Sequence, residues 1–247
     1  LEEDSMRPTP PLKWFDDSLH RLVALLPTPK PRLIRESVSY RFEQKTVEAA
    51  ILLKVARYVS GLHAGQFLLE RGFVQELCAL QRSIADFDED ATFLALACIY
   101  NEMTVLHERY LASFWEEEPS YKDYVQAQKN KDEVPRSKIT SYIARTTSGG
   151  SPDHHHIATS KYLSRLYSGF VHGAAPHLMD MYDPMTRKFE VNGTASDQLI
   201  ADHRHDFENY LFRGVILFAV AAQALGDTQL HVEAMGLHRK ILTHYAN

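Results

Sequence analysis

An arginine and a histidine lie seven residues apart in the stretch LSRLYSGFVHGAA, which spans residues 163–175. In an α-helix this spacing places Arg165 and His172 about 20° apart around the axis and roughly 10 Å apart along it, so both side chains share one face. Arginine presents a permanent charge on a planar fork that suits a phosphate group, and histidine exchanges a proton near neutral pH. The pair therefore predicts phosphodiester chemistry without a metal or other cofactor, in which Arg165 holds the phosphate and His172 transfers the proton.

Two other arginines precede a histidine at a similar spacing. Arg57 lies six residues before His63, and Arg239 lies five residues before His244. A straight helix turns the side chains of these pairs about 120° and 140° apart. Helical geometry therefore leaves one candidate catalytic pair.

Small side chains lie between the two residues of that pair. Ser168 and Gly169 come three and four positions after Arg165, on the same side of a helix, and we expect them to form a shallow substrate groove next to Tyr167. An alternative remains open, in which serine and glycine permit close helix packing and the pair bonds to backbone or carboxylate groups.

A second polar cluster consists of His203, His205 and Asp206. These side chains are candidates for an outer layer of groups that orients His172. They could instead form half of a metal site, which would make the protein a metal hydrolase, or an ordinary exposed helix face. All three interpretations stay open from the sequence.

Basic residues accumulate before the catalytic pair. Lys138, Arg145 and Lys161 are the candidates for a basic patch that binds the RNA backbone. A solvated, charged insertion is the alternative explanation.

Another open question concerns four charged residues of one expected helix, Glu70, Arg71, Glu76 and Arg82. Their side chains either pair with one another on the surface or turn inward near the catalytic pair.

Two stretches carry a resemblance to a known family. They are YSGFVHGAAPHL at residues 167–178 and FLLERGFVQELCALQR at residues 67–82. With the arginine and histidine pair, they resemble a bacterial family of all-helical proteins related to the HEPN superfamily and to abortive-infection proteins. The resemblance implies a HEPN-like helical bundle that forms a homodimer with the pair near the dimer seam. It also implies metal-independent RNA cleavage by a toxin or phage-defence effector. The chain departs from active HEPN members at Leu166, where they carry a polar residue, and this departure concerns catalysis rather than the fold.

Composition and charge are those of an ordinary globular protein. Of the 247 residues, 45% are hydrophobic and 24% are charged, and the net charge of −5 gives no global attraction to nucleic acid or to an anionic membrane. The most apolar run, residues 214–225, is shorter than the roughly 20 residues of a spanning helix, so we expect a buried core helix. The opening residues lack the basic and apolar regions of a signal peptide, and two cysteines, Cys78 and Cys98, are expected to be reduced core residues. These features favour the cytoplasm.

Apolar residues at three- and four-residue spacing predict an all-α fold of about eight or nine helices, with strand-like alternation almost absent. The acidic residues 88–90 suit the positive N-terminal end of a helix. The main expected helices cover residues 12–26, 36–62, 64–87, 88–115, 153–173, 197–225 and 228–247.

The expected domain organisation has two parts. Residues 1–31 form an N-terminal helix and a proline-rich linker, and residues 32–247 form a single helical bundle with an exposed polar excursion at about 116–150. This excursion supports a second functional hypothesis, in which the protein is a non-catalytic helical module that binds a partner protein.

Overall fold

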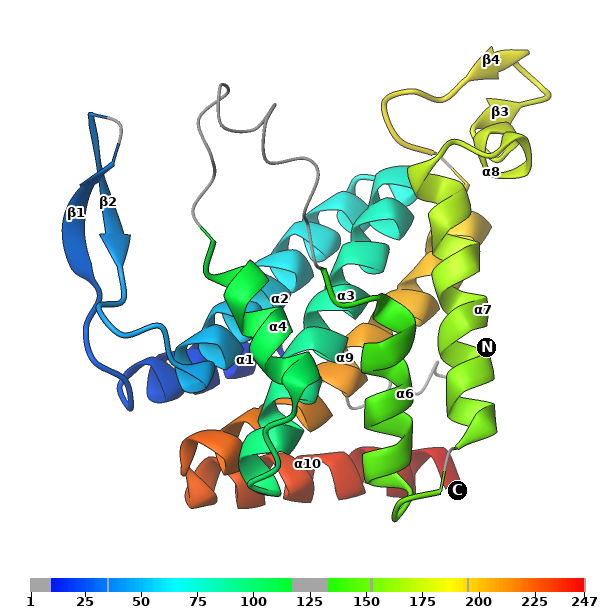
Figure 1. The fold of residues 1–247 in the computed structure, drawn as a ribbon. Helices are drawn as coiled ribbons and strands as arrows, with labels where there is room; N and C mark the ends of the chain where they lie inside the picture. The colour runs from blue at the N-terminus through cyan, green and yellow to red at the C-terminus, as the bar shows by residue number, and fades with distance from the viewer. Residues whose placement is uncertain (1–9, 35, 117–132, 152, 195, 247) are drawn as a thin grey trace.

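The computed structural model describes residues 10–34, 36–116, 133–151, 153–194 and 196–246. The described part of the chain is all-α, with nine helices and two small antiparallel hairpins (Figure 1). The helices are α1 (Leu12–Val23), α2 (Val47–Glu70), α3 (Val74–Ile99), α4 (Val105–Phe114), α6 (Arg136–Thr147), α7 (His154–Val171), α8 (Ala175–Met179), α9 (Asp197–Leu225) and α10 (Thr228–Ala246). The strands are β1 (Lys30–Ile34), β2 (Ser37–Arg41), β3 (Tyr182–Asp183) and β4 (Lys188–Phe189).

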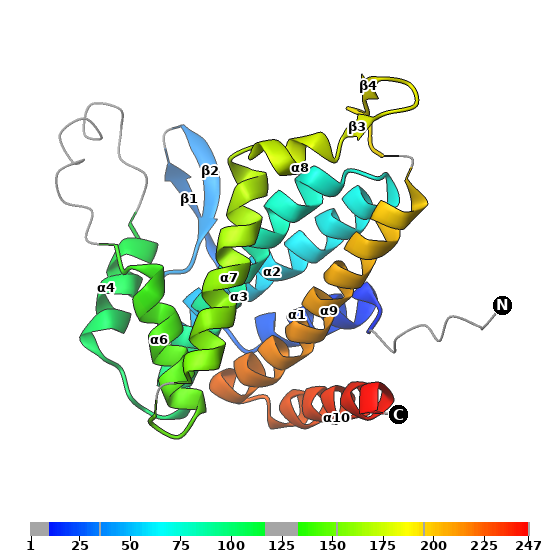
Figure 2. The same cartoon turned by 90° about the vertical axis from the view of Figure 1, so that its right-hand side faces the viewer.

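Three long helices, α2, α3 and α9, form the centre of the bundle and pack on one another. Helix α10 crosses the lower end of α9, and α1 packs against α2 and α9 (Figure 1). Helices α6 and α7 both pack against α3. In Figure 2, α7 lies between α6 and α9. The apolar run at residues 214–225 lies in α9 and is mostly buried, as expected. Among the described residues, no helix is long and apolar enough to span a membrane.

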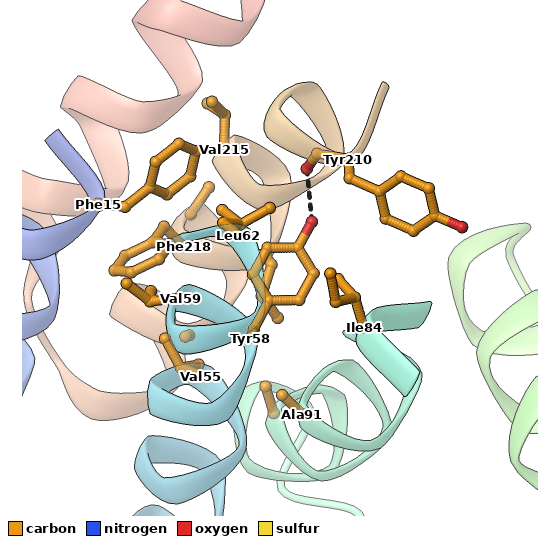
Figure 3. Close-up of a cluster of buried hydrophobic side chains, with 14 of the residues drawn as sticks. Phe15, Val55, Tyr58, Val59, Leu62, Ile84, Ala91, Tyr210, Val215 and Phe218 are labelled. Carbon is orange, nitrogen blue, oxygen red and sulfur yellow. Dashed lines mark hydrogen bonds between the residues drawn. The ribbon is translucent and has the colours of Figure 1, made fainter. Parts of the chain in front are cut away.

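Glycines let the three central helices approach closely. A Cβ on Gly61 of α2 would lie 2.7 Å from Ile84 of α3, and a Cβ on Gly65 would lie 2.6 Å from Phe207 of α9. Buried aromatic rings fill the neighbouring layer, where the hydroxyl of Tyr58 donates a 2.5 Å hydrogen bond to the carbonyl of Tyr210 (Figure 3). This bond satisfies a hydroxyl that would otherwise be buried without a partner.

The expected helix over residues 36–62 is wrong in its first third. Ser37–Arg41 pairs with Lys30–Ile34 in a hairpin, and α2 begins only at Val47. The segment SVSYR alternates small polar residues with a β-branched and an aromatic residue, which favours a strand. Thr46 then caps α2, because its side chain accepts a 3.2 Å hydrogen bond from the amide of Ala49.

The expected helix break at residues 88–90 is also wrong. Helix α3 runs without interruption from Val74 to Ile99, so these three acidic residues lie in its middle. The break between α2 and α3 comes at Gly72, which has a φ of +71° that suits glycine. The acidic residues bind cationic side chains of other helices rather than a helix N-terminus.

Backbone groups join this turn to the segment that precedes α9. The amide of Thr194 donates a 2.9 Å hydrogen bond to the carbonyl of Gly72, and Gly193 has a φ of +98°. A Cβ on Gly72 would lie 2.5 Å from the Thr194 carbonyl oxygen, and a Cβ on Gly193 would collide with the carbonyl of Arg71. We call this contact the glycine clasp; it tolerates no side chain at either glycine.

Several expected helix boundaries are confirmed. The side chain of Ser196 accepts a 3.3 Å hydrogen bond from the amide of Leu199 at the start of α9, and Gly226 ends that helix in a left-handed conformation. Helix α7 ends at Val171, close to the expected end at Gly173.

Part of the expected polar excursion lies outside the described residues, namely 117–132. Its later part belongs to the bundle, since α6 buries Ile139, Tyr142 and Ile143 against the core.

Candidate functional site

Helix α7 carries the candidate catalytic pair on its exposed side. Arg165 and His172 are both exposed, and neither side chain forms a hydrogen bond or ion pair with another described residue. His172 directly follows α7, and its amide donates a 3.0 Å hydrogen bond to the carbonyl of Ser168, so it continues the helical path. The expected shared orientation of the pair is therefore compatible with the backbone.

The space next to Gly169 is occupied by protein. A Cβ at this position would lie 2.6 Å from Nε2 of His177, a residue of α8. The His177 ring stacks on Phe170 with a centroid distance of 3.8 Å. Gly169 thus permits α8 to fold back against α7, and the groove between the pair is narrower here than serine and glycine alone suggest.

Ser168 and Tyr167 contact a cavity of about 690 Å³ between α7 and the helices α3, α6 and α9. Arg165 also lines this cavity, whereas His172 lies outside it. Tyr167 is buried, and its ring lies edge-on to Tyr210 at 6.2 Å between centroids. Burial raises the pKa of Tyr167 above its usual value and raises the pKa of Tyr210 to about 12, so both phenols stay protonated at neutral pH.

His203 packs beneath the C-terminal part of α7. Its Nδ1 atom is 3.3 Å from Sγ of Cys78 and 3.9 Å from a carboxylate oxygen of Asp206, and its ring lies edge-on to Phe170. Burial lowers the pKa of His203, so it is neutral at pH 7. His205 is exposed on the other side of α9 from these contacts. His203 therefore supports the packing of α7 on α9. Phe170 lies between His203 and the face of α7 that carries the pair.

The two cysteines are free in the structure, as expected of reduced core residues. Burial raises the pKa of Cys78 to about 12 and that of Cys98 to about 11. Across the described ranges, no three histidine, cysteine, aspartate or glutamate side chains come together in an arrangement that could hold a metal ion. The described part of the chain thus offers no ligand set to the metal-hydrolase hypothesis.

The expected basic patch separates into two groups. Lys138 and Arg145 are exposed on α6 and lie outside the cavity, whereas Lys161 is exposed on α7 and lines the cavity with Arg165. Among the four charged residues of the other open question, Arg82 lies at the cavity wall, and the remaining three, Glu70, Arg71 and Glu76, are exposed.

A network of charges on α3 was not expected from the sequence. Asp88 binds Arg213 of α9, with 2.6 Å between a guanidinium nitrogen and a carboxylate oxygen. Glu89 accepts hydrogen bonds from Arg136 of α6 at 3.2 Å and from the Ser160 hydroxyl of α7 at 2.6 Å. Asp90 binds Lys54 of α2 at 2.7 Å and also Arg136, and Asp86 binds Arg82 and Arg136. We call these eight charged residues the α3 charge network; it ties α2, α6 and α9 to the middle of α3, and the Ser160 hydroxyl adds α7.

Comparisons of the chain with protein families, with curated proteins and with solved structures give no match. The resemblance to HEPN-related proteins therefore stays a hypothesis that rests on its residues.

Proposed function

We propose that the protein is a cytoplasmic, homodimeric endoribonuclease that cleaves RNA without a metal ion, with Arg165 and His172 as its catalytic residues. The observation that carries this proposal is the free state of the pair. Both side chains are exposed at the same end of α7, and no other described residue binds either one. Buried polar groups are held by protein partners, whereas exposed side chains without such a partner are accessible to a substrate.

The chemistry follows from the two residue types. Arg165 would hold the non-bridging oxygens of the scissile phosphate and stabilise the negative charge that develops on them. The 2′-hydroxyl of the same nucleotide attacks phosphorus, and the bond to the 5′-oxygen breaks. His172 would either take the proton of the hydroxyl or protonate the leaving oxygen, and water would make the other proton transfer, so that the products are a cyclic phosphate and a free 5′-hydroxyl.

A direct test measures RNA cleavage in the presence of EDTA for the wild type and for His172→Ala and Arg165→Gln. We expect each substitution to lower the rate by about a hundredfold or more, because an acid–base group and a charge-stabilising donor each typically contribute that much. The matched control is His154→Ala, which removes another exposed histidine from the same helix. Activity that survives His172→Ala, or that requires added metal, would remove the basis of the proposal.

A second candidate function is binding of a partner protein, and one specific observation favours it. The β1–β2 hairpin projects from the bundle and exposes three large apolar side chains, Leu33 at 76%, Val38 at 68% and Tyr40 at 67% (Figure 1). Exposed apolar groups that gather on one element are typical of interaction surfaces. Under this hypothesis, the triple variant with serine at these positions loses a partner that His172→Ala retains in a pull-down.

A further inference from the structure

We propose that the cavity beneath α7 binds a small amphipathic organic anion, with its apolar body inside and its anionic head at Lys161, Ser164, Arg165 and Ser168. This inference shares Arg165 with the proposed RNA cleavage but does not depend on it, because His172, the proposed proton-transfer residue, lies outside the cavity.

The size and walls of the cavity suit a small molecule. Its volume of about 690 Å³ lies within the range of roughly 300–1,000 Å³ that is typical of small-molecule sites. Four helices contribute to it, and apolar side chains form much of the wall: Leu96, Ile143, Ile157, Leu163, Ile216 and Val220. A ligand with an apolar body would therefore be desolvated on binding.

The charges at the wall are unbalanced. Five cationic and three acidic side chains line the cavity. All three carboxylates, Asp86, Asp88 and Glu89, already bind guanidinium groups of the α3 charge network. Lys161 and Arg165 have no acidic partner within the described ranges, so the wall carries an excess of two positive charges.

The two unpaired cations lie on one stripe of α7 with two hydroxyl groups. Lys161, Ser164, Arg165 and Ser168 follow one another at helical spacing, and all four line the cavity. Neither serine side chain forms a hydrogen bond to any residue that the structure describes. Two cations and two unpaired donors on one stripe form a site for a phosphate, sulfonate or carboxylate head.

The carboxylates of the opposite wall are bound by other residues, so they do not pair with the cations of the α7 stripe. Glu89 contacts α7, and its carboxylate is held by Ser160, Arg136 and Thr140. Asp88 is held by Arg213 through two nitrogen atoms at 2.6 and 3.1 Å. These contacts fix the carboxylates within the wall and leave the α7 stripe to attract an anion.

The test uses anilinonaphthalene sulfonate, a fluorescent probe with an aromatic body and one anionic head, and the whole chain. We expect saturable binding of one probe molecule per chain, with affinity that falls as salt increases. The double variant Lys161→Gln/Arg165→Gln should bind at least about tenfold more weakly. The matched control Lys138→Gln/Arg145→Gln removes the same charge outside the cavity and should bind like the wild type.

Two further variants address the body of the ligand. Ile216→Trp and Ser164→Leu each reduce the space inside the cavity and should abolish binding, and far-ultraviolet circular dichroism checks that each variant keeps its helices. The neutral probe N-phenylnaphthylamine should bind the wild type and the double charge variant equally. Equal affinity of the sulfonate probe for the two double variants, or retained binding in both filled variants, would overturn the proposal. His172→Ala should lose RNA cleavage but keep probe binding, so the two proposals fail separately.

Discussion

The ion pair between Asp88 and Arg213 allows a quantitative test of how the α3 charge network stabilises the fold. Only 14% of the Asp88 side chain and 32% of the Arg213 side chain are exposed, and Arg213 faces the cavity. Burial raises the pKa of Asp88 above its usual value although Arg213 opposes this shift. Burial also disfavours the charge of Arg213, but the Asp88 carboxylate keeps its pKa above the usual value.

Removal of either partner should destabilise the protein, but in different ways. In Asp88→Ala, the charge of Arg213 is left without a partner, and arginine cannot lose its proton at any accessible pH. Loss of one partner from a buried pair costs about 3–5 kcal/mol, and we expect about 3 kcal/mol because the cavity partly hydrates the guanidinium. In Arg213→Met, Asp88 can escape by taking up a proton, because a carboxylate without its cationic partner has a further raised pKa.

The two variants therefore differ in their pH dependence. A raised carboxylate pKa in the folded state gives stability that is present at low pH and is lost as pH rises through that pKa. The deficit of Arg213→Met should thus shrink as pH falls from 7 to 5.5, by at most about 1.4 kcal/mol for each pH unit. The deficit of Asp88→Ala should not shrink as pH falls over this range, because that variant has no carboxylate to take up a proton.

Urea unfolding at pH 5.5 and pH 7, followed by circular dichroism, measures the free energy of unfolding of each variant relative to the wild type. Asp17→Ala serves as a control, because the Lys13–Asp17 pair is exposed and should contribute only about 0.5 kcal/mol or less. The reasoning fails if Asp88→Ala costs less than about 1 kcal/mol, or if both buried-pair variants show the same pH dependence.

Two further predictions concern the packing of the core. Gly214→Ala should lower the free energy of unfolding by about 1–2 kcal/mol, although alanine favours helix, because its Cβ would lie 2.7 Å from Phe15 and 2.9 Å from Tyr58; an unchanged or raised urea midpoint would contradict this. Cys78, whose pKa burial raises to about 12, should react with a disulfide reagent at pH 8 only as fast as the protein unfolds. Modification of the folded protein at the rate of a small free thiol would show that the site opens more readily than its packing implies.

The sequence predicted correctly those helix ends that are set by a capping or terminating residue at the end itself. The side chain of Ser196 caps the start of α9, and the left-handed backbone of Gly226 ends it, so the expected and observed limits of this helix agree. The hairpin at residues 30–41 was missed, because its short alternating strand adjoins the strongly helical pattern of α2. A helical period extends easily over a few neighbouring residues when no proline interrupts it.

The α3 charge network had no local signal of this kind. The run Asp88 to Asp90 resembles the first turn of a helix, and the groups that explain it, Arg136 and Arg213, lie far away in the sequence. The cavity could not be predicted from the sequence for the same reason, because residues of four separate helices form its walls. The pair is exposed in the structure, whereas the side chain of His177 fills part of the groove that the sequence predicted at Gly169.

The glycine clasp has a consequence for the order of folding. It joins the turn after α2 to the segment before α9, and most of the described helices lie between these two points in the sequence. A contact of such long sequence separation carries a large loop-closure entropy, so it forms after the local helices. The Thr194 amide should therefore gain protection from hydrogen exchange late in refolding, although it belongs to no helix or strand. Its protection would report the moment at which the turn after α2 meets the segment before α9.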